Sequence, residues 1–285
     1  MRRRHIVLGA TFAVLATTGG LVAAAAPASA APSYNKYVAL GDSYAAVGSL
    51  WDVSGTPGCF RSASNYAHDL AKDLGVGSLT DETCGSAVTA DMTQPQNTGL
   101  GANPPQFDGL TADTNLVTVT IGGNDFGFGD IATTCATMGA LSPIGDPCQQ
   151  HYTVNGVDQL AASISPVAAK VGAVIQGIKQ RAPQAKIVVV GYLPIMPPQN
   201  GCWPSIPIAG GDATWLYGIQ RQLDAAIAAQ ATDNGAIGID PSGITGHDAC
   251  QLPWVRWVEP VLGLPPLHPN AAGQSNLATL IATKL

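Results

Sequence analysis

The stretch Tyr37-Val38-Ala39-Leu40-Gly41-Asp42-Ser43 decides the fold that this sequence predicts. Its first four residues are apolar or aromatic and a glycine stops the run, which is typical of a buried strand that ends at the carboxyl edge of a sheet. Ligands and chemistry gather at that edge in open α/β sheets. Ser43 follows in a tight turn, where it could act as a nucleophile or simply cap a helix.

Two further segments place polar side chains at similar junctions. Gly122-Gly123-Asn124-Asp125 directly follows the apolar run 116–121. Its glycines let the backbone approach a ligand, and Asn124 offers an uncharged amide donor that suits an oxyanion, although a glycine turn with an Asn cap is the alternative. Leu267-His268-Pro269-Asn270 precedes the last helical pattern, so the His268 ring is expected at a loop–helix junction.

Together these segments resemble the GDSL, or SGNH, hydrolase family, and the resemblance runs from about residue 37 to the C-terminus. It implies that Ser43 is the nucleophile, that His268 is the general base and that Asn124 donates to an oxyanion hole, together with the Ser43 backbone N–H. The glycine block of the family is similar to Cys84-Gly85-Ser86-Ala87. The family glycine falls on Ser86 and Gly85 stands one place earlier, so either residue could supply the remaining backbone N–H.

The sequence departs from the family just before the histidine. The family usually has an aspartate three residues earlier, and this chain has Pro265 there. We therefore predict a Ser43–His268 dyad in which the main-chain carbonyl of Pro265 or Pro266 orients the histidine ring. Nothing in the spacing singles out a substitute among the acidic residues further away, which are Asp240, Asp248 and Glu259.

The first 30 residues have the pattern of a signal peptide. Residues 1–5 are basic, residues 6–26 are mostly apolar, and Ala28-Ser29-Ala30 is a small-residue cleavage site. A membrane anchor is the alternative, but the interruption Thr17-Thr18-Gly19-Gly20 favours cleavage. We expect a secreted, extracellular protein whose residues 31–285 form a single hydrolase domain. No other segment looks long and apolar enough for a stable membrane span after cleavage.

Charge and cysteine content restrict the partners. The formal net charge of −6 argues against a nucleic-acid partner. The six cysteines form no Cys-x-x-Cys pair, so no metal site is expected, and their even number predicts disulfides in an exported protein. Short loops are the easiest to close, and the resemblance to secreted actinobacterial-type members of the family implies the same sequential pairing. The expected pairs are Cys59–Cys84, Cys135–Cys148 and Cys202–Cys250.

Strand and helix patterns alternate along the chain, which predicts a parallel sheet covered on both faces. Strands are expected at residues 37–40, 116–121, 187–192 and 236–239, with a weaker one near 76–80. Helices are expected at residues 64–74, 157–181, 213–234 and 270–284. The predicted fold is α/β: a three-layer α/β/α sandwich built on a flavodoxin-like, doubly wound sheet of about five strands, which the resemblance also implies.

These features predict a monomeric serine esterase that hydrolyses carboxylic esters through an acyl-enzyme on Ser43. No cofactor is expected, because neither a Gly-x-Gly-x-x-Gly nor a P-loop pattern occurs. The apolar loop 251–267 could be a buried cover over the sheet, a wall for an acyl chain, or both, and it favours lipid esters, as in a lipase, phospholipase or carboxylesterase. A carbohydrate acetyl esterase is the alternative substrate class. A secreted, non-catalytic binding protein on the same scaffold is the alternative of another kind.

Overall fold

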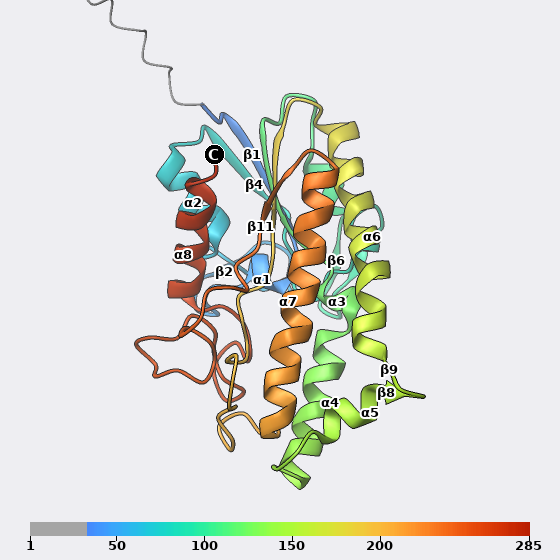
Figure 1. The fold of residues 1–285 in the computed structure, drawn as a ribbon. Coiled ribbons are helices and arrows are strands. Elements are labelled where there is room, and N and C mark those ends of the chain that lie inside the picture. Colours follow the sequence, from blue (N-terminus) through green and yellow to red (C-terminus); the bar gives the residue numbers. More distant parts are fainter. Residues whose placement is uncertain (1–32) are drawn as a thin grey trace, which may run out of the picture. The chain divides into compact units, whose positions relative to one another are not determined.

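The computed structural model of the protein describes residues 33–285; the expected signal peptide lies outside the described residues. A parallel sheet of five strands forms the centre of the described chain, in the order β4-β1-β7-β10-β11 (Figure 1). Numbered along the chain this is the order 2-1-3-4-5 of flavodoxin-like folds, so the predicted fold class is confirmed. The strands are β1 (Lys36–Gly41), β4 (Ser78–Asp81), β7 (Leu116–Thr120), β10 (Lys186–Val190) and β11 (Ile237–Ile239).

Helices cover both faces of this sheet. On one face α2 (Tyr66–Leu74) packs against α8 (Ala271–Ala282), and on the other α6 (Gln159–Arg181) packs against α7 (Gly210–Asp233) (Figure 1). Side-chain caps start three of these helices: Asn65 caps α2, Asp158 caps α6 and Asn270 caps α8. The layers therefore match the predicted sandwich, and each of the four predicted helices is present.

Several shorter elements have no counterpart in the predicted pattern. The longest is α4 (Phe128–Leu141), whose many small residues give no clear apolar stripe in the sequence. The other short helices are α1 (Ser43–Ala46), α3 (Gly123–Phe126), α5 (Pro147–Tyr152) and the 3₁₀ turns η1 (Thr89–Met92) and η2 (Gln106–Gly109). The small hairpins pair β2 (Val53–Ser54) with β3 (Arg61–Ser62), β5 (Gln96–Asn97) with β6 (Ala102–Asn103), and β8 (Thr153–Val154) with β9 (Val157–Asp158).

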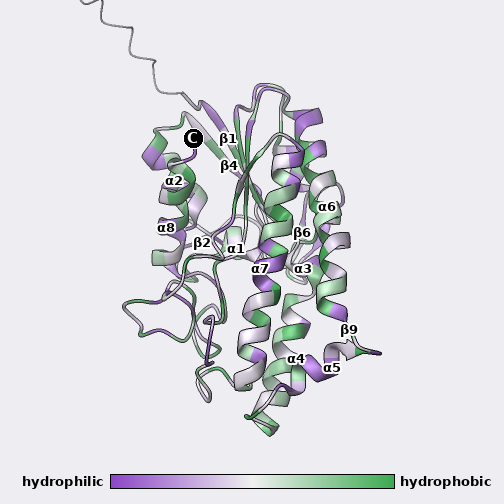
Figure 2. Cartoon of the chain, in the orientation of Figure 1, coloured by the Kyte–Doolittle hydropathy of each residue, from purple (hydrophilic) through white to green (hydrophobic). Residues whose placement is uncertain are grey.

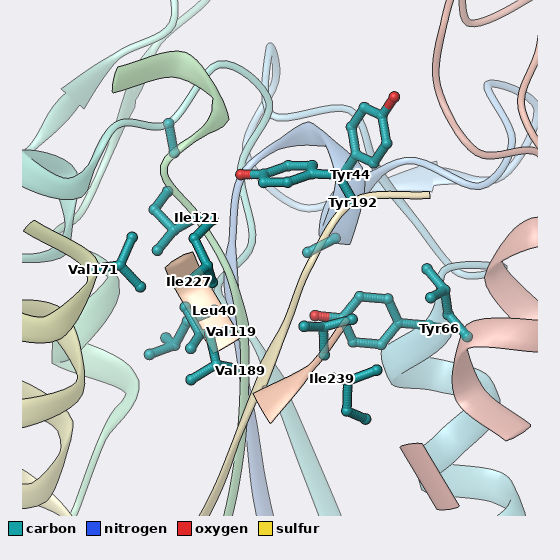
Figure 3. Packing of buried hydrophobic residues seen from close by; sticks show 14 of the residues in the cluster. Leu40, Tyr44, Tyr66, Val119, Ile121, Val171, Val189, Tyr192, Ile227 and Ile239 are labelled. Atoms are coloured by element: carbon teal, nitrogen blue, oxygen red, sulfur yellow. The ribbon is translucent and has the colours of Figure 1, made fainter. Parts of the chain in front are cut away.

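The core lies between the sheet and its two helical layers. Figure 2 shows the strands mostly in green, whereas purple residues lie mainly on the outer sides of the helices. In Figure 3 the side chains of Leu40 and Val119 lie near Val171 of α6 and Ile227 of α7, and all four are buried. Burial on both faces explains the nearly continuous apolar runs of β1 and β7.

By length and composition alone, α6 could cross a membrane, so the expectation that no segment after the leader has these properties is wrong. Its alanines raise the mean hydropathy of the helix. Its larger apolar residues, such as Val171 and Ile175, are buried in the core cluster. Lys170 and Lys179 of the same helix make polar contacts with Asp125 and with the carbonyl of Asn234.

The three disulfides have the expected sequential pairing, Cys59–Cys84, Cys135–Cys148 and Cys202–Cys250. Cys59–Cys84 ties the loop after β1 to the loop after β4. Cys135–Cys148 joins α4 to α5, and Cys202–Cys250 joins the loops that follow β10 and β11. All three crosslinks therefore act on segments beyond the carboxyl edge of the sheet.

The loop 251–267 is only partly a cover. Val258 is fully buried and forms an isolated bridge with Pro269. Trp257 and Val261 are partly buried against the core, whereas Leu252, Trp254, Leu262 and Leu264 are exposed, with Leu262 at 92%, so a buried cover describes only part of the loop. Such a loop keeps a few anchors in the core and presents the rest of its apolar surface to the outside.

Candidate active site

Ser43 and His268 meet beyond the carboxyl end of β1. His268 Nε2 lies 2.7 Å from Ser43 Oγ, and His268 Nδ1 lies 2.6 Å from the carbonyl oxygen of Pro266. A carbonyl oxygen only accepts, so Nδ1 carries the hydrogen and Nε2 accepts from the serine hydroxyl. The carbonyl of Pro265, the other predicted orienter, lies 3.4 Å from the backbone nitrogen of His268 and accepts its N–H.

The three acidic residues considered from the sequence lie in other hydrogen bonds. Asp240 accepts from Ser242, and Asp248 accepts from the backbone N–H of Cys250. Glu259 accepts from Arg256 at 2.6 Å and from the Asn270 side chain at 3.0 Å. Among residues 33–285, no carboxylate makes a hydrogen bond to the His268 ring.

Three N–H groups beside this pair could together hold an oxyanion. Within the described chain, the backbone N–H groups of Ser43 and Ser86 have no acceptor. Asn124 donates one side-chain hydrogen to the carbonyl of Ala87 at 2.9 Å, which leaves its second hydrogen free. Gly85 donates instead to the carbonyl of Cys59 at 2.8 Å. Of the two alternatives in this block, only Ser86 has its N–H available.

The backbone at Ser86 has a conformation that favours glycine. Its φ is +64°, in the left-handed region that strains most residues with a side chain. Gly85 is constrained differently, because a Cβ there would lie 3.0 Å from the carbonyl oxygen of Cys59. Gly85 thus allows the close packing beside the Cys59–Cys84 disulfide, and Ser86 lines the groove with an N–H that has no acceptor among the described residues.

Asp42 braces the turn that carries Ser43. It is 1% exposed, accepts from the Tyr44 backbone N–H at 2.9 Å and from the Tyr192 hydroxyl at 2.6 Å, and burial raises its pKa to about 7. The Tyr192 hydroxyl in turn accepts from the Gly123 N–H at 2.7 Å. The ends of β1, β7 and β10 are thereby joined through one buried tyrosine, which sequence reasoning missed; its only signal was its place at the end of a predicted strand.

Two more residues absent from the sequence prediction hold the histidine loop. The Tyr44 hydroxyl donates to the carbonyl of Leu267 at 2.7 Å, beside the His268 ring. Gln274 of α8 donates to the carbonyls of Tyr44 and Val47 at 2.9 and 2.7 Å. Nothing in the local pattern indicated either contact, because both join segments more than 200 residues apart in sequence.

Burial lowers the pKa of His268, and the hydrogen bond to the Pro266 carbonyl opposes this shift in part. The imidazole therefore stays neutral to lower pH than an unperturbed histidine. A neutral ring with a hydrogen on Nδ1 is the form that can take a proton from Ser43.

A groove of about 1070 Å³ opens from the Ser43 hydroxyl. Ser86, Asn124 and His268 line the groove at the end nearest Ser43. Its walls come from α4, from α7 and from the loops that follow β1 and β10, with Val261 and Leu267 contributed by the loop 251–267. Within residues 33–285, no group of three or more His, Cys, Asp and Glu side chains is arranged to hold a metal ion.

A Ser–His pair at the carboxyl edge of a doubly wound α/β/α sandwich, with N–H donors converging beside it, is the arrangement of a serine hydrolase. Residues 39–275 match the GDSL-like lipase/acylhydrolase family model. The chain belongs to this family and is a carboxylic ester hydrolase.

Known relatives share most of the chain. It is 41% identical to Lipase 2 of Streptomyces coelicolor, over 95% of this chain and 94% of that protein. The crystal structure of phospholipase A1 from Streptomyces albidoflavus NA297 is similar with a TM-score of 0.73 and 30% identity, covering 89% of this chain and all of that one. The extracellular lipase of Streptomyces rimosus gives a TM-score of 0.72 at 28% identity, covering 87% and 99%.

Proposed function

We propose that this protein is a secreted, monomeric serine esterase that hydrolyses lipid acyl esters without a metal or other cofactor. The apolar groove that opens from the Ser43 hydroxyl carries this proposal. Among the described residues, its lining includes one carboxylate, the buried Asp42, and no lysine or arginine. A groove of this kind stabilises a hydrocarbon chain by removing it from water, at about 25 cal/mol per Å² of buried apolar surface.

In the proposed mechanism, His268 Nε2 takes the proton of Ser43 as Oγ attacks the ester carbonyl carbon. The tetrahedral intermediate collapses to an acyl-enzyme when His268 returns the proton to the leaving alcohol. Water then attacks the acyl carbon, again with His268 as base, and Ser43 leaves as the free hydroxyl while the acid is released. The Pro266 carbonyl holds the ring in the required tautomer throughout.

The oxyanion is stabilised by the Ser43 and Ser86 backbone N–H groups and by the free side-chain hydrogen of Asn124. The bond from Asn124 to the Ala87 carbonyl fixes the amide, so no reorganisation is needed as charge develops. The same reasoning explains how a dyad works without a carboxylate. The Pro266 carbonyl stabilises the imidazolium of His268 only weakly, but the fixed N–H donors stabilise the oxyanion of the same transition state.

Carbohydrate acetyl esterase, the other substrate class, fits the groove less well. A sugar needs several hydrogen-bonding side chains, and among the polar side chains of the groove walls Thr133, Thr137 and Gln220 already bond within the protein. Gln220 donates to the carbonyls of Tyr192 and Leu193 and accepts from Ile195 N–H. Lipid esters also agree with the names of the relatives, which are lipases and a phospholipase A1.

Secretion is supported by the three disulfides, by the leader pattern in the sequence and by the extracellular lipase among the similar structures. A monomer is supported by the completeness of the site, since every group in the mechanism comes from one chain. The disulfide-linked loops fit an enzyme that works outside the cell.

A panel of esters tests the function. We expect purified protein to hydrolyse p-nitrophenyl esters with a preference for acyl chains of about eight carbons or more, because longer chains bury more apolar surface in the groove. Phospholipid and acetylated xylan are assayed beside them. Activity confined to acetyl esters and xylan would favour the carbohydrate class, and no hydrolysis of any ester would contradict the proposal.

The dyad makes a prediction about the acidic residues. Replacing Asp240 or Asp248 by asparagine, or Glu259 by glutamine, should change kcat by less than about tenfold, since none of them contacts the histidine ring. Glu259 is the most demanding case, because its backbone N–H also bonds to the His268 carbonyl at 2.9 Å, and this bond survives the substitution. A loss of about 10⁴-fold at any of the three positions would reveal a hidden triad.

The pKa of His268 makes a prediction about pH. The acidic limb of log kcat/KM should fall below the ordinary histidine value of about 6.5, because burial keeps the ring neutral to lower pH. A pH series on a soluble short-chain ester measures it. The same series on Asp42→Asn is the control. A limb near pH 7 that disappears in this variant would assign the titration to Asp42, whose pKa burial raises to about 7, and would contradict the assignment to His268.

A further inference from the structure

One side of α4 forms a wall of the groove that leads away from the active site. α4 begins four residues after Asn124 and runs away from the sheet (Figure 1). Ala132, Ala136 and Ala140 recur every four residues on the side that lines the groove. These alanines leave the groove open where larger side chains would fill it. In Figure 2 the helix is mostly white and green along its length.

The facing wall is built from larger apolar side chains. Leu216 and Ile219 of α7 line the groove across from α4, together with Met196 and Ile208 of the loop between β10 and α7. The three alanines of α4 therefore face bulky side chains, while the larger α4 residues that line the groove, Phe128, Ile131 and Leu141, lie toward the two ends of the helix. Such a cross-section suits a single unbranched chain, because the alanines provide the space and the larger residues provide the contact.

The threonine hydroxyls of the α4 wall already have hydrogen-bond partners within the helix. The Thr133 hydroxyl donates to the Gly129 carbonyl at 2.9 Å and the Thr137 hydroxyl to the Thr133 carbonyl at 2.8 Å. Such bonds to the preceding turn of a helix satisfy a hydroxyl locally. A hydrocarbon chain on this side of α4 would leave no polar group of these threonines unpaired.

The two walls belong to one rigid frame. The Cys135–Cys148 disulfide ties α4 to α5, and Asp212 near the start of α7 accepts from the backbone N–H groups of Cys148 and Gln149 at 2.9 and 2.8 Å. The wall that contains Ile208 is also fixed against α4, because the Pro207 carbonyl lies within 2.3 Å of where a Cβ at Gly139 would be. The width of the groove is therefore fixed before substrate binds.

We propose that the groove along α4 is the acyl-binding site and that Ala132, Ala136 and Ala140 mark successive distances along the bound chain. This inference rests on the proposed function and adds where the acyl chain lies and what limits its length. Residues 129–141 of α4 extend about 18 Å at 1.5 Å per residue. Carbon–carbon bonds of about 1.5 Å at tetrahedral angles advance about 1.25 Å each, so this wall is long enough for roughly 14 carbons.

The test places a large side chain at each of the three alanine positions. Ala132→Phe, Ala136→Phe and Ala140→Phe are assayed for kcat/KM on p-nitrophenyl esters of two to sixteen carbons. Each ring should block the groove at a different distance from Ser43. The maximum acyl length that is accepted should therefore be smallest for Ala132→Phe and greatest for Ala140→Phe. For esters beyond each limit, kcat/KM relative to the best substrate of that variant should fall at least about tenfold below the wild-type ratio.

Ala229→Phe is the matched control, because Ala229 is an exposed alanine on α7 that lies outside the groove, and its chain-length profile should equal that of the wild type. Thermal melting checks the fold, and the smaller leucine at the same position replaces any phenylalanine variant that does not fold. Folded variants that all keep the wild-type profile, or limits that do not follow the order along α4, would overturn the inference. Failure of the proposed function has a different signature, which is the absence of ester hydrolysis by the wild-type protein.

Discussion

Replacing Ser43 by alanine should abolish ester hydrolysis, with a loss of at least about 10⁴-fold in kcat. The substitution removes the oxygen that forms the acyl-enzyme, and water activated by His268 would have to attack the substrate directly. The hydroxyl's hydrogen-bond partner in the structure is His268 Nε2, and the backbone of Ser43 still accepts from the Val47 N–H. We therefore expect the variant to stay folded, with a melting temperature close to that of the wild type.

Labelling with a fluorophosphonate probe measures the same residue independently of any substrate. The wild-type protein should label and Ser43→Ala should not. Ser275→Ala is the matched control, because Ser275 is an exposed serine on α8, and it should label and turn over like the wild type. Residual turnover within about tenfold of wild type would place the nucleophile elsewhere. Absence of labelling in the folded wild-type protein would instead favour a non-catalytic binding protein.

The sequence was sufficient to predict the residues at the carboxyl ends of adjacent strands. β1 and β7 are neighbours in the sheet, and Gly41 stands opposite Thr120 in their register. Ser43 and Asn124 follow these strands by only a few residues, so the order of strands alone brings them together. His268 joins them because α8, which begins at its Asn270 cap, packs on the same side of the sheet as α2.

Choices between adjacent residues required the three-dimensional structure. Gly85 and Ser86 look equally suited to donate an N–H, and what separates them is the carbonyl of Cys59, which the Cys59–Cys84 disulfide brings to Gly85. Pro265 and Pro266 differ in the same way, since only the turn geometry of the loop decides which carbonyl faces the ring. Main-chain hydrogen bonds of this kind leave no signature in side-chain type.

The α4 helix was missed for a related reason. A helix is recognised in a sequence by an apolar stripe against a polar face, and α4 has small residues on the side that lines the groove. The absence of bulky apolar residues at Ala132 and Ala136 removes the signal and at the same time leaves room for a ligand. Sequence reasoning is least reliable at such places, where a surface is shaped to bind something other than the protein itself.

Replacing Asn124 by alanine should lower kcat by about 10²–10³-fold and leave KM nearly unchanged, which corresponds to about 2.7–4 kcal/mol of transition-state stabilisation. The ground-state carbonyl oxygen carries little charge, so a donor directed at the oxyanion position gains most of its strength as the tetrahedral intermediate forms. The bond from Asn124 to the Ala87 carbonyl keeps the amide in place in the free enzyme, so the free hydrogen is already directed at that position.

Asn124→Asp separates this electrostatic role from side-chain size. Aspartate keeps the shape of the residue and replaces the donor by a negatively charged acceptor, so its kcat should be no higher than that of Asn124→Ala. Asn276→Ala is the matched control, because Asn276 is an exposed asparagine on α8 whose amide donates to a helix carbonyl, and it should behave like the wild type. An increase in KM at constant kcat for Asn124→Ala would contradict the role in the oxyanion hole, since it would mean that the amide binds substrate and transition state equally. Because the backbone N–H groups of Ser43 and Ser86 are unchanged in Asn124→Ala, the rate that remains in this variant measures how much these two donors stabilise the oxyanion.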